Sequence, residues 1–326
     1  MKPEITLIVT TCNSIDILKL FWEYLEKYTY IPFKTIVVDN GSSDGTIDFL
    51  KSLNAVVIRN PVNIGVVKAL NQAEKLVNTK YLLSISDDVL VTPNWLEDLI
   101  KVYESDKLIK TVAPIKPGTK IKYPYSNESS RKVWGKIKES NPGKHPSELL
   151  KMYCNGRSFE KFVNDIKTTN NFGLETLESP PEFVSGCCVL TEKDFIGSIG
   201  GFSDTRFHIY SCEDVDRCWR IGKAGYKVVR TSNVFVHHFE GVGLFNNSVE
   251  WKGLMKENNK LFIDKWKDDF WPLLRNKIDK FSTISDVVKK HWLIGWLLES
   301  LDEDNIPDDL KGIVKDYLSA NELKLN

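Results

Sequence analysis

The 326-residue sequence has no long hydrophobic run, because no stretch reaches the roughly 18 uninterrupted apolar residues of a membrane-spanning helix. It has no excess charge of one sign either, since 44 basic and 44 acidic side chains cancel. A neutral chain has no overall field that attracts nucleic acid, so we expect no nucleic-acid partner. The first residues lead directly into a strand pattern, so we also expect no signal peptide. These absences predict a cytoplasmic protein, and peripheral contact with a membrane stays open as an alternative.

Cysteine pairs with the C-x-x-C spacing of metal and redox sites are also missing. No two of the six cysteines form a C-x-x-C motif, which predicts buried free thiols in a reduced compartment. A zinc site would need a cysteine to meet a histidine across the fold, and the spacing indicates no such meeting. The six are Cys12, Cys154, Cys187, Cys188, Cys212 and Cys218.

The first hundred residues alternate between short apolar runs and helical patterns. Continuous apolar strands are typical of a sheet covered on both faces, and strand–helix–strand order implies right-handed crossovers with mostly parallel pairing. The sequence therefore predicts an α/β fold with a mostly parallel central sheet flanked by helices. Strands are expected at 5–11, 35–40, 56–60 and 81–86, and helices at 14–28, 44–53, 65–77 and 93–105.

The pattern weakens after residue 106 and becomes regular again after residue 182. We expect a long loop at 116–146, one helix at 147–168 and irregular chain at 168–181. Loops of this length inside a compact protein are usually functional. Regular segments return at 183–190, at 211–224 (a helix) and at 226–238 (a strand), and the last 80 residues are predicted to be helical.

Polar residues cluster where three of the predicted strands end, at 10–13, 39–45 and 86–88. Ligands of an open α/β sheet bind outside the carboxyl ends of its strands, so these clusters predict a binding crevice. The dinucleotide motif G-x-G-x-x-G is missing after the first strand, and so is the P-loop motif, which disfavours a nicotinamide enzyme and a P-loop NTPase. The adjacent carboxylates of Asp87 and Asp88 repel each other, so a nearby group is expected to make their negative charge favourable.

Six motifs follow one another along the chain: TTCN, VVDNGSSDGT, NPVNIGVVKALNQA, SDD, GSIGGF and CEDVDRCWR. Their order resembles that of family 2 glycosyltransferases with the GT-A fold, over about residues 4–245. The resemblance implies inverting transfer of a sugar from a nucleotide-diphosphate donor, usually with a divalent metal. It implies a catalytic domain at 1–245, with a nucleotide-binding half (1–106), a variable insert (107–182) and an acceptor half (183–245), followed by a helical C-terminal region (246–326).

By this resemblance, Ser86-Asp87-Asp88 stands in the position of the family's D-x-D motif. Asp88 is then the direct ligand of Mn²⁺ or Mg²⁺, which favour carboxylate oxygens. Asp87 would face hydroxyl groups of the ribose or the sugar. The sequence departs from the family at Ser86, where aspartate is frequent, and this puts the metal affinity in doubt. The competing interpretation is two solvated acids at the end of a strand.

The resemblance also implies a set of residues that bind the donor. Asp39 would accept a hydrogen bond from a uracil-like imide, which points to a UDP-sugar. Asn63 and Gly65 open a helix whose N-terminus suits anions, and Lys68 lies one turn later, where a solvated lysine is an equal alternative. The full set is Thr10, Thr11, Asn13, Asp39, Asn63, Gly65, Lys68, Ser86, Asp87 and Gly186.

The segment Glu213-Asp214-x-Asp216 resembles the family's E-D-x-D motif, whose aspartate is the general base. Inversion needs a carboxylate opposite the leaving group and near the acceptor hydroxyl. We assign this role to Asp214, with Glu213 as second choice. The competing interpretation is structural: a capping box at the start of this helix, and i,i+4 ion pairs of Glu213 with Arg217 and of Asp216 with Arg220.

The adjacent histidines His237 and His238 end a predicted strand. A histidine at this place completes the metal shell in many metal-dependent relatives. His238 aligns better, and His237 would point to the opposite face of the strand. A buried structural histidine is the competing interpretation.

The segment 287–301 has an apolar face that includes Trp292 and Trp296. Such a face packs on its own domain or on a second subunit, giving a homo-oligomer, or it lies in a membrane interface beside a lipid-linked acceptor. We favour packing.

Three functions compete at this level. The first is a metal-dependent, inverting glycosyltransferase that moves a sugar from a UDP-sugar to a hydroxyl of a glycan, lipid-linked or protein acceptor. The second is a sugar-nucleotide pyrophosphorylase, which would need a basic glycine-rich loop after the first strand. The third is a catalytically silent nucleotide- or carbohydrate-binding module, against which the presence of both Asp88 and Asp214 argues.

Overall fold

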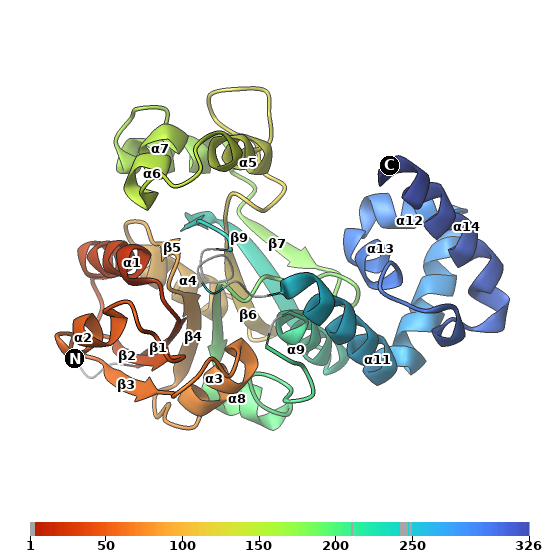
Figure 1. The fold of residues 1–326 in the computed structure, drawn as a ribbon, viewed down its shortest axis with the longest axis horizontal. Coiled ribbons are helices and arrows are strands. Elements are labelled where there is room, and N and C mark those ends of the chain that lie inside the picture. Colours follow the sequence, from red (N-terminus) through yellow and green to blue (C-terminus); the bar gives the residue numbers. More distant parts are fainter. Residues whose placement is uncertain (1–3, 210, 242–246, 248–249, 326) are drawn as a thin grey trace.

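The computed structural model describes residues 4–209, 211–241, 247 and 250–325. Its centre is an eight-stranded sheet of order β3-β2-β1-β4-β8-β6-β9-β7, and helices cover both faces (Figure 1). A separate two-stranded sheet joins β5 to β10. The strands are β1 (Ile5–Thr11), β2 (Lys34–Asp39), β3 (Val56–Arg59), β4 (Tyr81–Ser86), β5 (Val89–Leu90), β6 (Ile109–Ile115), β7 (Leu174–Leu177), β8 (Cys188–Glu192), β9 (Lys227–Phe235) and β10 (His237–His238).

The first hundred residues fold as predicted. Strands β3, β2, β1 and β4 pair in parallel, and a helix follows each of them, which confirms the α/β sheet. The continuous apolar pattern has the expected cause, because Leu7 and Val9 of β1 are buried in one core cluster while Ile8 is buried in another. The helices are α1 (Ile15–Tyr28), α2 (Thr46–Lys51), α3 (Val66–Glu74) and α4 (Trp95–Glu104).

The segment after residue 106 is more regular than predicted. The expected loop at 116–146 contains the helix α5 (Ser130–Ser140), and the expected irregular chain contains the edge strand β7. The single helix expected at 147–168 is instead α6 (Pro146–Tyr153) and α7 (Phe159–Thr169), because Asn155 and Gly156 between them adopt positive φ angles of 54° and 70°. The lysine-rich α5 escaped prediction because long-range packing holds it: Trp134 is 1% exposed and contacts the ring of His237.

The C-terminal region is helical, as predicted, and lies to one side of the sheet (Figure 1). Its long helix α11 (Trp251–Phe281) packs on α9 (Glu213–Lys223) through aromatic contacts of Trp219 with Phe262 and Trp266. None of the helices in the described ranges is both long and apolar enough to span a membrane. The remaining helices of the chain are α8 (Lys193–Ser198), α9 (Glu213–Lys223), α11 (Trp251–Phe281), α12 (Ile284–Lys290), α13 (Trp292–Leu298), the short 3-10 helix η1 (Glu303–Asn305) and α14 (Asp308–Leu325).

Candidate active site

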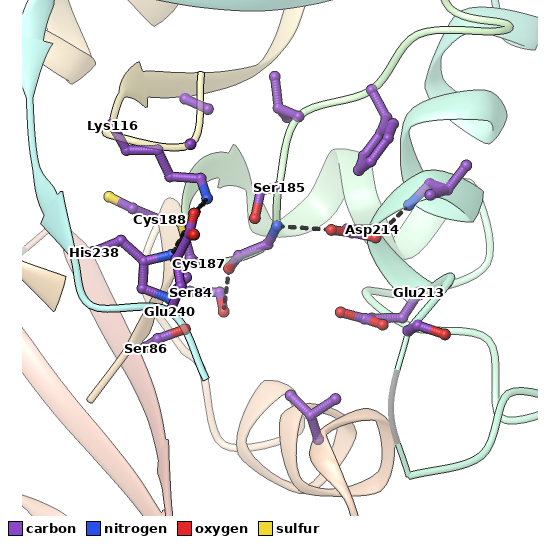
Figure 2. Close-up of a pocket in the computed structure, with 18 of the residues that line it drawn as sticks. Ser84, Ser86, Lys116, Ser185, Cys187, Cys188, Glu213, Asp214, His238 and Glu240 are labelled. Atoms are coloured by element: carbon purple, nitrogen blue, oxygen red, sulfur yellow. Dashed lines mark hydrogen bonds and ion pairs between the residues drawn. The ribbon is translucent and has the colours of Figure 1, made fainter. Parts of the chain in front are cut away.

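A cavity of about 980 Å³ lies beyond the carboxyl ends of β1 and β4. Its walls come from segments far apart in sequence, namely 10–12, 84–88, 183–188 and 211–217, together with parts of the C-terminal helices. Asp88 and Asp214 both line this one cavity. Figure 2 shows two groups of polar side chains, one around His238 and one around Asp214, with the segment around Ser185 between them.

The pairing of β5 with β10 brings Asp88 to His238. Val89 is the partner of His238 in this antiparallel pair, and the Asp88 carbonyl accepts a hydrogen bond from the Phe239 N–H at 3.0 Å. As a result, His238 Nε2 lies 3.1 Å from Asp88 Oδ1. The histidine is thus the neighbour that makes the Asp88 charge favourable at the end of β4.

The two adjacent acids at the end of β4 differ in charge. Burial, followed by repulsion from Asp88, raises the pKa of Asp87 to about 7. Burial acts on Asp88 in the same direction, but the attraction of His238 outweighs it and holds the pKa of Asp88 below its usual value. The repulsion expected from the sequence is therefore relieved, because Asp88 carries the charge while Asp87 titrates near neutrality.

Lys116, Glu240 and Cys187 surround the other side of His238. Lys116 Nζ lies 2.9 Å from Glu240 Oε1 and 3.3 Å from His238 Nδ1 (Figure 2). The buried thiol of Cys187 also interacts with His238. The inference that no cysteine meets a histidine is therefore wrong, because the turn before β8 carries Cys187 across the sheet to β10. The prediction of buried free thiols is confirmed for five of the six cysteines, while Cys12 is free but only partly buried.

His237 faces away from this cluster. Its ring lies among Trp134, Tyr153 and Phe239, at centroid distances of 4.5, 4.9 and 4.7 Å. Burial lowers the pKa of His237 to about 3, so it is a neutral core residue.

Asp39 lies at the end of β2, and one of its two carboxylate oxygens accepts no hydrogen bond from the described residues. Its Oδ1 accepts a hydrogen bond from the Ser42 N–H at 3.2 Å, and Arg59 Nε lies 3.8 Å from Oδ2. This buried Oδ2 has no hydrogen-bond partner among the described residues. Thr10 and Thr11 of the neighbouring strand β1 line the cavity, whereas the fully buried Asp39 side chain does not.

The helix-opening motif at α3 is built around Gly65. Asn63 Oδ1 accepts a hydrogen bond from the Gly65 N–H at 2.9 Å, and Gly65 has a φ of 85°. A Cβ at position 65 would lie 2.5 Å from Ile209 Cα, so the position requires glycine. Asn63 and Gly65 line the cavity, whereas Lys68 is exposed and does not line it.

Asn13 also stays outside the cavity wall. Its Oδ1 accepts a hydrogen bond from the Ser43 N–H at 2.8 Å, and its Nδ2 donates to Asn247 at 2.7 Å. The structure therefore uses Asn13 to hold the loop after β2. Three predicted donor-binding residues, Asn13, Asp39 and Lys68, do not line the cavity that the other seven line.

The other carboxylate group of the cavity lies at the start of α9. Asp214 Oδ2 accepts a hydrogen bond from the Gly186 N–H at 3.1 Å, and Oδ1 accepts one from the Val215 N–H at 2.8 Å (Figure 2). These two bonds fix the orientation of the carboxylate. Burial raises the pKa of Asp214, and the nearby Arg217 guanidinium opposes that rise.

The predicted ion pair of Glu213 with Arg217 is absent between these described residues, whereas that of Asp216 with Arg220 is present at 2.9 Å. The fully buried Arg217 instead places its guanidinium carbon 4.2 Å from the ring centre of Phe202. Asp216 receives further contacts from the long helix α11, including a hydrogen bond from Trp266 Nε1 at 2.9 Å. The structural role considered for Asp216 and Arg220 thus agrees with their contacts, and the helix i,i+4 rule failed for Arg217.

Glu213 is expected to make stability depend on pH. Burial, with the charge of Asp214 as second cause, raises the pKa of Glu213 from a usual value of 4.5 to about 8. Between these values the folded state binds one more proton than the unfolded state, so stability falls as the pH rises from about 4.5 to about 8. Glu213→Gln stays neutral and removes this loss. Its melting temperature should exceed that of the wild type by roughly 2–4 °C at pH 8.5 and by less at pH 5; an equal difference at both pH values contradicts this.

Comparison with known proteins agrees with the motifs. Residues 6–162 match the family model described as Glycosyl transferase family 2. The O-antigen chain rhamnosyltransferase of Salmonella typhimurium is 23% identical over 239 residues, which are 72% of this chain and 66% of that protein. An N-acetylglucosaminyl-diphospho-decaprenol L-rhamnosyltransferase of Mycobacterium tuberculosis is 42% identical over 65 residues, or 20% of each chain. The chain thus spans just under two thirds of the first relative and a fifth of the second.

A solved structure shares the fold. The mannosyltransferase PcManGT from Pyrobaculum calidifontis, in complex with GDP-Man and Mn²⁺, superimposes with a TM-score of 0.55 over 92% of this chain and 74% of that one. At 15% sequence identity this similarity shows the fold alone. The matched region, the order of the motifs and the sheet topology lead to one assignment: residues 6–162 form a Glycosyl transferase family 2 domain, and the chain has the GT-A fold.

Proposed function

We propose that the protein is a metal-dependent, inverting glycosyltransferase that moves a sugar from a UDP-sugar to an acceptor hydroxyl, with Asp214 as the general base. The observation that carries this proposal is the placement of two acids in one cavity. Asp88 lies beside His238 at the end of β4, and Asp214 is held by the Gly186 N–H. The segment around Ser185 lies between His238 and Asp214 (Figure 2).

Asp88 and His238 are suited to hold the metal ion. A carboxylate and an imidazole in contact form a donor set that Mn²⁺ accepts. Among the residues that the structure describes, no group of three or more His, Cys, Asp and Glu side chains is placed to hold a metal. Two protein donors nonetheless suit an ion that is shared with substrate phosphates. A bound divalent ion would stabilise the negative charge that develops on the leaving diphosphate, and the Mn²⁺ in the PcManGT complex supports this role.

The unused oxygen of Asp39 supports a pyrimidine base with an imide N–H. The carboxylate is fully buried at the end of β2 and does not itself line the cavity, so a base N–H that reaches it past the adjacent wall would satisfy Oδ2. Uracil provides this N–H, and thymine presents the same edge. The backbone of Thr10 and Thr11 would form the adjacent wall of the base pocket.

Asp214 is arranged to receive a proton. Its two backbone hydrogen bonds leave lone pairs on both oxygens. Its raised pKa makes it a stronger base than an exposed aspartate, and so a better acceptor for the proton of the acceptor hydroxyl. The acceptor hydroxyl would donate a hydrogen bond to Asp214 and attack the sugar from the side opposite the diphosphate. The names of the rhamnosyltransferase relatives support a glycan or lipid-linked acceptor.

Metal removal tests the donor site. We expect the Kd of UDP, measured by calorimetry, to rise at least tenfold when Mn²⁺ is replaced by EDTA, and to recover when Mn²⁺ is restored. Asp88 and His238 then lack the cation that links them to the diphosphate. Equal affinity for UDP with and without Mn²⁺ contradicts a metal-dependent donor site.

Turnover is measured separately with UDP-sugars and with dTDP-rhamnose. Release of the nucleoside diphosphate, increased by a panel of glycosides, supports transfer. Tight binding of UDP and Mn²⁺ with no hydrolysis and no transfer from any donor would favour the silent binding module.

A further inference from the structure

The C-terminal helices contribute an aromatic wall to the cavity. Trp292 at the start of α13 lines the cavity and is 51% exposed. Its ring lies 5.7 Å from that of Phe183 and 6.2 Å from that of Trp296, and both of these residues also line the cavity. A tryptophan ring that is half exposed at the wall of a cavity presents a large flat apolar surface to whatever enters.

The aromatic wall is rigid. Leu293, Ile294 and Leu297 on the same helix are buried in the second core cluster, so α13 cannot turn freely. Trp296 Nε1 donates a hydrogen bond to Met255 Sδ at 3.1 Å, which ties α13 to α11. This buried face confirms that the segment packs on its own chain, and it leaves Trp292 as the ring whose surface is open.

The aromatic wall lies close to Asp214 along the chain. Phe183 precedes Gly186 by three residues, and the Gly186 N–H donates to Asp214. Three residues span at most about 10–11 Å. The Phe183 end of the stacking surface therefore has its backbone within about 10–11 Å of Gly186, which holds the proposed base.

Polar groups surround these rings. Both ring nitrogens of His291 are buried, have no hydrogen-bond partner among the described residues, and belong to a side chain that lines the cavity. Glu182 and Lys290 line the same part of the wall. A sugar ring has one apolar C–H face and a rim of hydroxyl groups, so it matches flat rings with hydrogen-bonding side chains beside them. An acyl or prenyl chain would leave these polar groups unsatisfied.

We propose that Trp292, with Phe183, is the stacking surface of an acceptor subsite that binds a pyranose ring. This inference deepens the proposed function and rests on it in one respect. The bound ring is identified as the acceptor because the subsite adjoins Asp214, the proposed base. The ring could belong to a free glycan or to the sugar head group of a lipid-linked acceptor, because both present the same chemistry.

The test uses methyl pyranosides of glucose, galactose, mannose, rhamnose and N-acetylglucosamine as probes, with the full chain. Saturation-transfer NMR with the wild type should show binding of at least one of them, with the strongest transfer to the C–H groups of one ring face. Trp292→Ala should raise the Kd of that glycoside about 10- to 30-fold. Trp292→Phe should restore most of the binding, because it keeps an aromatic face.

Two controls separate this inference from the proposed function. Tyr30 is 60% exposed and outside the cavity wall, so Tyr30→Ala should leave glycoside binding unchanged. UDP binding with Mn²⁺ and donor hydrolysis are measured with the wild type, and the absence of either would count against the proposed function alone, because glycoside binding is measured without a donor. Unchanged glycoside binding in Trp292→Ala, or no glycoside binding to the wild type, overturns the subsite.

Decyl glycosides and decyl phosphate distinguish the two sources of the sugar. A decyl glycoside that binds more tightly than its methyl counterpart, with both weakened by Trp292→Ala, indicates the head group of a lipid-linked acceptor. Equal affinity of the two glycosides indicates a free glycan. Binding of decyl phosphate without binding of any methyl glycoside would show a lipid site and overturn the proposal.

Discussion

Asp214→Asn is expected to lower the rate of sugar transfer by about 10²- to 10⁴-fold while the Kd of UDP with Mn²⁺ stays unchanged. Asparagine keeps the shape of aspartate, and its carbonyl oxygen can accept the hydrogen bond from the Gly186 N–H, whereas its amide group cannot accept the one from the Val215 N–H. It cannot accept a proton from the acceptor hydroxyl, so only the chemical step should suffer. Single-turnover transfer and calorimetry with UDP and Mn²⁺ measure the two quantities separately.

Glu213→Gln is the matched control for the assignment of the base. Because burial raises the pKa of Glu213 to about 8, this side chain is mostly protonated at pH 7 and glutamine imitates its neutral form. The variant should therefore keep its transfer rate within about tenfold of the wild type, a smaller loss than general-base removal causes. A larger loss in Glu213→Gln than in Asp214→Asn would move the base to Glu213. Equal loss of transfer and of UDP binding in both would indicate general misfolding.

The first half of the sheet was predictable because local sequence determines it. Leu7 and Ile8 point to opposite faces of β1 and are both apolar. This continuous apolar pattern arises because helices cover both faces of the sheet. The polar ends of β1, β2 and β4 then had to meet at one edge. The motif at 213–216 could also be found from local sequence, because its residues are consecutive.

The contacts that shape the cavity were not predictable, since they join residues more than a hundred positions apart. Lys116 meets Glu240 and His238 only because β6 and β9 pair and carry their following segments to the same place. Likewise, nothing local shows that Trp292 lies against Phe183. The position of Arg217 was misjudged because the helix rule considers only neighbours one turn away, and tertiary packing placed its guanidinium over Phe202.

Asp88→Ala is expected to remove most of the metal dependence of donor binding. The ratio of the Kd of UDP in EDTA to that in Mn²⁺ should be large for the wild type and close to one for the variant. Outer-shell partners of metal ligands typically contribute about 10- to 100-fold to metal affinity, so a direct ligand should contribute at least as much. Asp48→Ala is the control, because Asp48 pairs with Lys51 on the exposed surface of α2.

Loss of Asp88 also removes the partner of His238, so stability must be followed together with binding. The imidazolium of His238 and the ammonium of Lys116 would then lie buried with less compensating charge, and the melting temperature should fall. Asp88→Asn retains the shape and a hydrogen-bond acceptor, so it should fold closer to the wild type while still losing the carboxylate that the metal needs. A Kd ratio in Asp88→Asn equal to that of the wild type would remove Asp88 from the metal site. A ratio near one, in a variant that melts as a folded protein, leaves Asp88 as the residue through which the cation acts on the donor.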